Sequence, residues 1–140
     1  MFKKLTTYLT LAATLFTGAM FFMEFAEYMS NDNEIKRTMY YDNVGYLTIL
    51  IMIITGCLIS VLTHKHPLLQ ARVCMITGLM LVGFQIWLGV DFIRLNDQFI
   101  FSVSMLFPLA AAALEIIAAR IALIDGMTLQ AVKYFKNIKK

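Results

Sequence analysis

"FPLAAAALEIIAAR", residues 107–120, is an apolar, alanine-rich stretch with a single carboxylate, Glu115, near its middle. It lies within a longer apolar run at 99–124, and about 20 mostly apolar residues are enough to cross the hydrocarbon core of a bilayer. Three further runs of this kind lie at 5–25, 44–63 and 73–93. The sequence therefore predicts an all-α membrane protein whose residues 1–126 form a four-transmembrane-helix bundle with up-down-up-down topology.

The composition supports this class of protein. Of the 140 residues, 60% are hydrophobic and 15% are charged, and the mean hydropathy is +0.74. A soluble domain is nearer half apolar and a quarter charged. The sequence contains no HExxH motif, no nucleophile elbow, no P-loop and no cluster of Cys and His ligands. We therefore expect a non-enzymatic protein with no metal and no cofactor.

The lysine and arginine residues predict the orientation, because short cytoplasmic loops are enriched in them. With the N-terminus inside, three of the 12 fall outside: Lys36, Arg37 and Arg94. The other nine fall inside: Lys3, Lys4, Lys65, Arg72, Arg120, Lys133, Lys136, Lys139 and Lys140. We therefore expect a multi-pass protein of a bacterial inner (cytoplasmic) membrane with both termini in the cytoplasm. The net charge of +3 then reflects topology and contact with anionic lipid headgroups, not nucleic-acid binding.

The first apolar run has an alternative interpretation as a cleaved signal peptide, because Lys3 and Lys4 precede it. The run is long for the apolar region of a signal peptide, and "FTGAMFF" offers no clean small-x-small cleavage site. We expect this segment to be retained as a helix.

The last segment, 127–140, follows a break in the pattern at Asp125–Gly126. Its apolar residues recur at helical spacing on one face, and its lysines occupy the opposite arc: Lys133, Lys136, Lys139 and Lys140. This pattern predicts a basic amphipathic helix that lies on the inner leaflet and contacts anionic headgroups. The alternative is a plain continuation of the fourth helix into the cytosol.

Polar residues within the first and third runs should face protein rather than lipid. Thr10, Thr14 and Thr17 recur at steps of four and three, and Gln85 lies near the middle of the third run. An amide without a hydrogen bond in hydrocarbon costs on the order of 4–8 kcal/mol, so we expect Gln85 to contact the threonine stripe. The stripe itself is either a packed seam between helices, which we favour, or the wall of a hydrated cavity.

Glu115 is the most deeply placed acidic residue of the sequence. Counted from residue 99 at 1.5 Å per residue, it lies about 24 Å down the fourth helix, nearer the inner headgroups than the bilayer centre. Arg72 and Arg120 are candidate partners at a similar depth. We favour an ion pair or a buried hydrogen bond over a proton or ligand site, but intramembrane acids also suggest function.

A second set of charges is expected at the outer boundary. Glu24 and Glu27 fall at the end of the first run, and Asp91 and Arg94 fall at the end of the third. Each pair is spaced three residues apart and so shares one side of its helix. If these two helices are neighbours, Arg94 can bridge to a carboxylate of the first.

The cysteines and histidines favour structural over chemical roles. Cys57 and Cys74 fall in the cytoplasmic halves of their helices and are expected to pack as small apolar residues. His64 and His66 lie in the loop "THKHP", so solvation is expected rather than metal or haem binding.

The order of features also resembles a known family. The start "MFKKLTTYLTLAA", the inner loop leading into "LLQARVCMITGLMLVGFQIWL", and the final "MLFPLAAAALEIIAARIALIDG" resemble a small four-helix inner-membrane family of Bacteroidota, a domain of unknown function. The resemblance is strongest at 66–126, and the sequence departs from the family at the N-terminus and in the tail. It implies four inner-membrane helices and supplies no chemistry.

Two functions remain open. The absence of reaction motifs favours an accessory or scaffold subunit of a membrane complex, or a bundle that binds lipid or a small ligand. The intramembrane carboxylates favour a small proton-coupled transporter or exporter that works as an oligomer. Small multidrug exporters have such a layout, but they carry their essential glutamate deep in the first helix.

Overall fold

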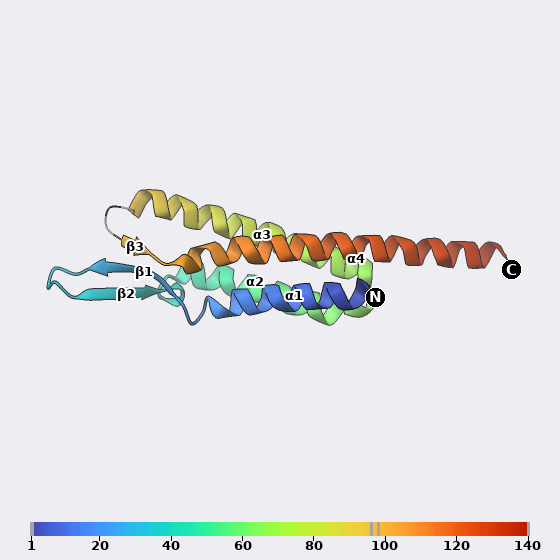
Figure 1. Cartoon of the computed structure of the whole chain (residues 1–140), viewed down its shortest axis with the longest axis horizontal. Helices are drawn as coiled ribbons and strands as arrows, with labels where there is room; N and C mark the ends of the chain where they lie inside the picture. Colours follow the sequence, from blue (N-terminus) through green and yellow to red (C-terminus); the bar gives the residue numbers. More distant parts are fainter. Residues whose placement is uncertain (1, 96, 98, 140) are drawn as a thin grey trace.

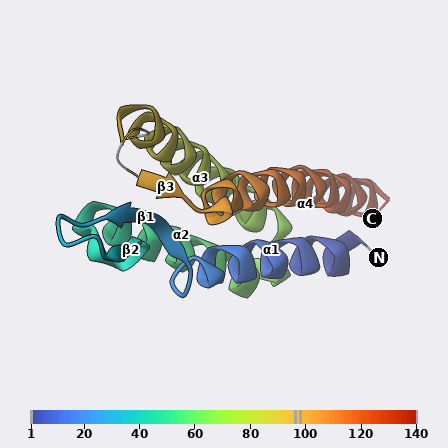
Figure 2. The same cartoon turned by 60° about the vertical axis from the view of Figure 1, so that its left-hand side comes forward.

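The computed structural model describes residues 2–95, 97 and 99–139, and most of these residues are helical (Figure 1). Four α-helices, α1 (Phe2–Ala19), α2 (Val44–Leu62), α3 (Pro67–Leu95) and α4 (Phe107–Ile138), run alternately in opposite directions along the long axis. α1 and α3 each pack against α2 and α4, so α1 and α3 lie diagonally across the bundle. Figure 2 shows the same arrangement from a second direction.

Within the described residues, three segments are long and apolar enough to cross a membrane: Val44–Lys65, Pro67–Leu95 and Val103–Ile138. For three of the four apolar runs this confirms the prediction of a helix that is long and apolar enough to cross a membrane. α1 is different, because its 18 residues include two lysines in the first turn and five threonines. At 1.5 Å per residue it is about 27 Å long, close to the thickness of the hydrocarbon layer. A fourth span through α1 stays a prediction.

The ends of the first and fourth apolar runs form a small sheet instead of helix. β1 (Glu24–Met29) pairs with β2 (Ile35–Met39) on one side and with β3 (Phe99–Phe101) on the other, both antiparallel. α1 therefore ends at Ala19, not near residue 25, and α4 begins at Phe107, not near residue 99. Both bounds were wrong because aromatic and β-branched residues in a short apolar run suit a strand as well as a helix.

An aromatic cluster attaches the sheet to the ends of the helices. The ring of Phe25 on β1 lies 5.5 Å from Tyr40, 5.2 Å from Tyr46 and 5.4 Å from Phe101, measured between centroids, all edge to face. Tyr46 of α2 also meets Phe84 of α3 at 5.8 Å. Such edge-to-face pairs contribute about 0.5–1.5 kcal/mol each beyond the burial of their area. The sheet is therefore a continuation of the core and not a loose loop.

α4 runs without a break from Phe107 to Ile138, so the helix end predicted at Asp125–Gly126 does not exist. Gly126 serves close packing instead, because a Cβ built on it would lie 2.6 Å from Cδ2 of Leu68 on α3. Pro108 occupies the first turn of α4, where its missing N–H needs no partner. Beyond Gly126 the helix projects past the other three (Figure 1), and its described residues there are exposed. The structure thus agrees with the alternative prediction, in which the fourth helix continues, and not with a separate amphipathic helix at 127–140.

Candidate functional site

Glu115 lies at the centre of the bundle and is completely buried. Small residues surround it on α4: Ala111, Ala112, Ala118 and Ala119. Gly78 brings α3 close, because a Cβ at that position would lie 3.6 Å from Cβ of Glu115. Glu115 is eight residues after the start of α4, which is about 12 Å along the helix axis. The predicted distance of about 24 Å was counted from residue 99, whereas α4 begins at Phe107.

Neither carboxyl oxygen of Glu115 has a hydrogen-bond partner among the described residues. Cys57 of α2 and Cys74 of α3 are the polar side chains that face it, but neither thiol meets it with hydrogen-bonding geometry. The Cys74 thiol lies 2.8 Å from the hydroxyl of Ser60 instead. The Nε2 of Gln70 donates to the carbonyl of Ser60 at 3.2 Å, which extends this buried polar line towards the inner end of the bundle.

The threonines of α1 bond to their own helix. The hydroxyl of Thr10 donates to the carbonyl of Thr7 at 2.9 Å, that of Thr14 to Thr10 at 2.8 Å, and that of Thr17 to Ala13 at 2.8 Å. Thr14 and Thr17 also face the Cys57 thiol, on the side of the bundle that holds Glu115. A threonine whose hydroxyl donates a hydrogen bond to the carbonyl one turn earlier in its own helix can pack in an apolar seam, because it needs no acceptor from another helix. These contacts agree with a packed seam.

The two arginines proposed as partners do not reach Glu115. Arg72 and Arg120 are both exposed, and neither makes an ion pair within the described part of the chain. Arg120 follows Glu115 by five residues, which rotates it about 140° around the helix, away from the bundle interior. The expected ion pair is therefore absent among the described residues, and the polar side chains that face the carboxyl group are the thiols of Cys57 and Cys74.

Gln85 does not contact the threonine stripe, because α1 and α3 are diagonal neighbours. It is half-buried, and its Oε1 has no partner among the described residues. It lines a pocket of about 360 Å³ between α3 and the segment that leads into α4. The other walls of this pocket include Phe92, Phe101, Val103 and Leu106. The amide thus faces the outer end of the molecule and not the centre.

The outer charge cluster forms with a different cation. Glu24 and Glu27 lie on β1, where Arg37 of β2 contacts both: Nη1 lies 2.9 Å from Oε1 of Glu24, and Nε lies 3.3 Å from Oε1 of Glu27. Arg94 is exposed at the end of α3 and does not bridge to β1. Asp91 accepts a hydrogen bond from Tyr46 of α2. The prediction of Arg94 as the partner assumed that Glu24 and Glu27 lie on a helix. They lie on a strand, and the register of the hairpin places Arg37 opposite Glu27.

The lysines predicted to contact the membrane surface lie on the projecting part of α4. Lys133, Lys136 and Lys139 are exposed there, and Lys140 lies outside the described residues. Among the described residues no group of three His, Cys, Asp or Glu side chains is arranged to hold a metal ion.

No protein-family model matches the chain, and no curated protein matches it either. The resemblance to the Bacteroidota family therefore stays a hypothesis, and the function has to be argued from the geometry.

Proposed function

We propose that this chain is a non-enzymatic integral membrane protein that serves as an accessory subunit of a membrane complex. In this proposal the four helices anchor it in a bacterial inner membrane with both termini in the cytoplasm. The projecting end of α4 binds the partner. The observation that carries the proposal is this projection, the segment 127–138, where every residue is exposed.

The projection presents a row of apolar side chains to its surroundings. Tyr134, Phe135 and Ile138 are 66%, 65% and 63% exposed, and Met127 and Ala131 share their face. Gly126 lies about 28 Å along α4, so the residues after it leave the hydrocarbon layer. Unlike the apolar surfaces of α2 and α3, this face therefore has no lipid core to cover it. Exposed apolar patches of this kind mark interaction sites.

The charge of the projection defines the partner. Lys133, Lys136 and Lys139 lie on the arc opposite the apolar row, and the described part of the projection carries no acidic residue. Two copies of this helix would repel each other, whereas an amphipathic helix with acidic flanks would be attracted. We therefore propose an acidic helix of a second membrane subunit as the partner.

The experiment is co-purification from native membranes after mild detergent extraction, with variants on the two faces of the projection. Phe135→Ser with Ile138→Ser should remove the partner, while Lys136→Ala, a matched change on the other arc, should retain most of it. If the wild-type protein is extracted as a lone monomer, or if both variants keep the partner equally, the proposal fails. A dimer that the apolar-face variant dissolves would identify a second copy as the occupant and contradict an acidic partner.

A second candidate, proton-coupled transport, is favoured by the isolated carboxyl group of Glu115. A buried carboxylate with neither a cation nor a donor is costly, so we infer that the side chain is protonated at rest. A group that can take up and release one proton near the midplane is what a proton-coupled carrier needs. The test is substrate-linked proton flux in vesicles that contain the protein: Glu115→Gln should abolish it, and undiminished flux in this variant would eliminate the candidate.

A further inference from the structure

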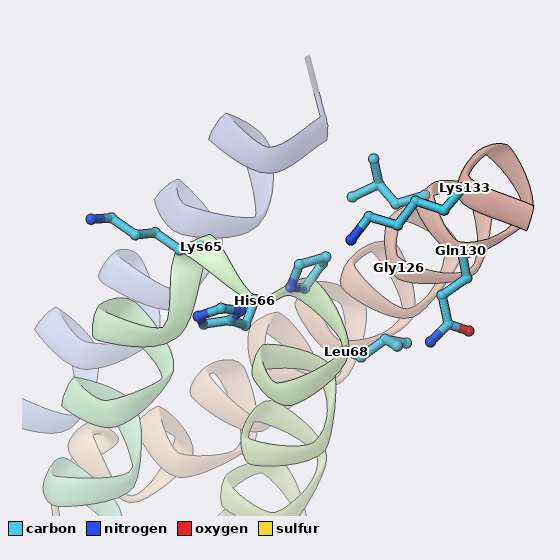
Figure 3. A pocket seen from close by; sticks show the side chains of 8 residues that line it. Lys65, His66, Leu68, Gly126, Gln130 and Lys133 are labelled. Atoms are coloured by element: carbon cyan, nitrogen blue, oxygen red, sulfur yellow. The ribbon is translucent and has the colours of Figure 1, made fainter. Parts of the chain in front are cut away.

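A basic pocket lies at the inner end of the bundle, between the α2–α3 loop and α4 (Figure 3). Its volume is about 360 Å³. Its walls come from two parts of the chain that Gly126 brings together, because a side chain there would collide with Leu68. The residues that line it are Lys65, His66, Pro67, Leu68, Gly126, Leu129, Gln130 and Lys133. None of these eight residues is acidic.

The donors of the pocket come from three elements. Figure 3 shows the Lys133 side chain running from α4 back towards the loop, while the amine of Lys65 and the ring of His66 both extend from the loop in the direction away from Lys133. The first N–H groups of α3 also lie at this end, since the helix starts at Pro67, and the backbone nitrogen of Leu68 lies against Gly126. A lysine, a histidine and the start of a helix on a pocket whose lining has no acidic residue suit an anion with several oxygens.

The position of the pocket matches the inner headgroup layer. Gly126 and Lys133 lie about 28 and 39 Å along α4 from Phe107. The hydrocarbon core is about 30 Å thick and the whole bilayer about 40–45 Å, so a span that starts near Phe107 puts the pocket beside the phosphates of the cytoplasmic leaflet. Leu68 and Leu129 add apolar wall beside the basic groups. An acyl chain can lie along such a wall while the headgroup faces the cations.

We propose that this pocket binds the phosphate group of an anionic phospholipid, with Lys133 as its main ligand and His66 at its edge. The inference rests on the membrane insertion that is part of the proposed function, and it adds a defined lipid site to it. Basic pockets between membrane helices on the cytoplasmic side favour anionic headgroups. Each cation near the surface contributes about 1 kcal/mol to the binding free energy, which is about fivefold in affinity. The phosphate group can belong to a lipid or to a free ion, and competition with inorganic phosphate distinguishes the two.

The experiment is native mass spectrometry of the full chain in detergent, titrated with phosphatidylglycerol or phosphatidylcholine. Wild-type protein should retain phosphatidylglycerol at least about fivefold better, and Lys133→Ala should lose about fivefold of that preference, with His66→Ala acting in the same direction. Lys136→Ala, which removes the same charge from the same helix outside the pocket, should change retention little. Equal retention of the two lipids, or an equal loss in Lys136→Ala, would overturn the proposal.

A second arm adds inorganic phosphate to the phosphatidylglycerol titration. The lipid assignment predicts that phosphate at millimolar concentration does not displace the bound lipid. Displacement that depends on Lys133 would instead assign the pocket to a free phosphate ion and contradict the lipid. Alkaline extraction of the protein from native membranes is the separate control: release into the soluble fraction would refute membrane insertion, whereas failure of the lipid titration alone would leave insertion standing.

Discussion

The hydroxyl groups of Tyr40 and Ser104 lie 2.8 Å apart, both fully buried, and join the segment before α2 to the segment before α4. Ser104 donates its own proton to the carbonyl of Glu24 at 2.8 Å, so the phenol of Tyr40 is the donor to Ser104. One serine thereby links β1 to both connections at the outer end of the bundle. The sheet is held at this point by hydrogen bonds between segments that are far apart in sequence.

This geometry predicts an order of stability for two substitutions. Tyr40→Phe removes only the donor to Ser104 and should cost about 1 kcal/mol of unfolding free energy. Ser104→Ala leaves both the Tyr40 hydroxyl and the Glu24 carbonyl without this partner, and should cost about 1–3 kcal/mol. Thermal unfolding in detergent measures both, and a Tyr40→Phe variant less stable than Ser104→Ala would contradict the assigned directions of the two bonds.

The same tyrosine predicts a loss of stability at alkaline pH. Burial raises the pKa of Tyr40 from 10.0 to about 12, against a smaller opposing effect of its bond to Ser104. An unfolded chain gives up this proton near pH 10 and the folded one near pH 12, so the contribution of Tyr40 is complete below about pH 10 and is lost between about pH 10 and 12. The decline should be smaller in Tyr40→Phe. A decline of equal size in the variant would remove Tyr40 as its cause.

The burial of Glu115 without a hydrogen-bond partner predicts that an apolar substitution there increases the free energy of unfolding. A buried polar group without a partner costs about 1–3 kcal/mol, and leucine is apolar and close to glutamate in size. Glu115→Leu should therefore raise the unfolding free energy by up to about that amount, and Glu115→Gln should stay close to wild type. Denaturation of purified protein in detergent checks both, and a strongly destabilised Glu115→Leu would mean that the carboxyl group has a partner after all.

Two glycines offer a matched test of helix packing. A Cβ on Gly83 meets nothing within 4 Å, whereas one on Gly126 would lie 2.6 Å from the Leu68 side chain. Gly83→Ala should stabilise the helix by about 0.5–1 kcal/mol, because alanine loses less backbone freedom on folding. Gly126→Ala should be less stable than Gly83→Ala and should narrow the basic pocket at the same time. Equal unfolding midpoints for the two variants would show that α3 and α4 are not this close.

The sequence predicted the helices because hydropathy over about 20 residues is a strong signal, but it did not predict where they end. The sequence around Phe25 and Phe101 is apolar enough for a membrane span, and only the pairing of β1 with β3, in which Ala26 faces Phe101, makes these segments strands. That pairing joins segments about 75 residues apart, which no local pattern reveals. The Arg37 contacts with Glu24 and Glu27 were missed because these glutamates were expected on a helix, whereas they lie on β1, which pairs with β2 in a hairpin.

The candidate site was partly predictable. That Glu115 is an exceptional residue followed from its apolar surroundings in the sequence. Its lack of an arginine partner was also within reach, because Arg120 lies five residues away and so faces outward. Its contact with Cys57 and Cys74 depends on how α2 and α3 rotate about their axes, which is set by packing around Gly78 and its neighbours.

The central claim is that the helices cross the membrane with the sheet outside and the end of α4 inside. The measurement is labelling of intact cells with a membrane-impermeant maleimide after Asp32→Cys, in the β1–β2 turn, or Asn137→Cys, near the end of α4. The native thiols of Cys57 and Cys74 are fully buried and should give no background. The account predicts labelling of Asp32→Cys in intact cells and of Asn137→Cys only after lysis. Labelling of Asn137→Cys from outside, or of neither variant until lysis, would contradict it.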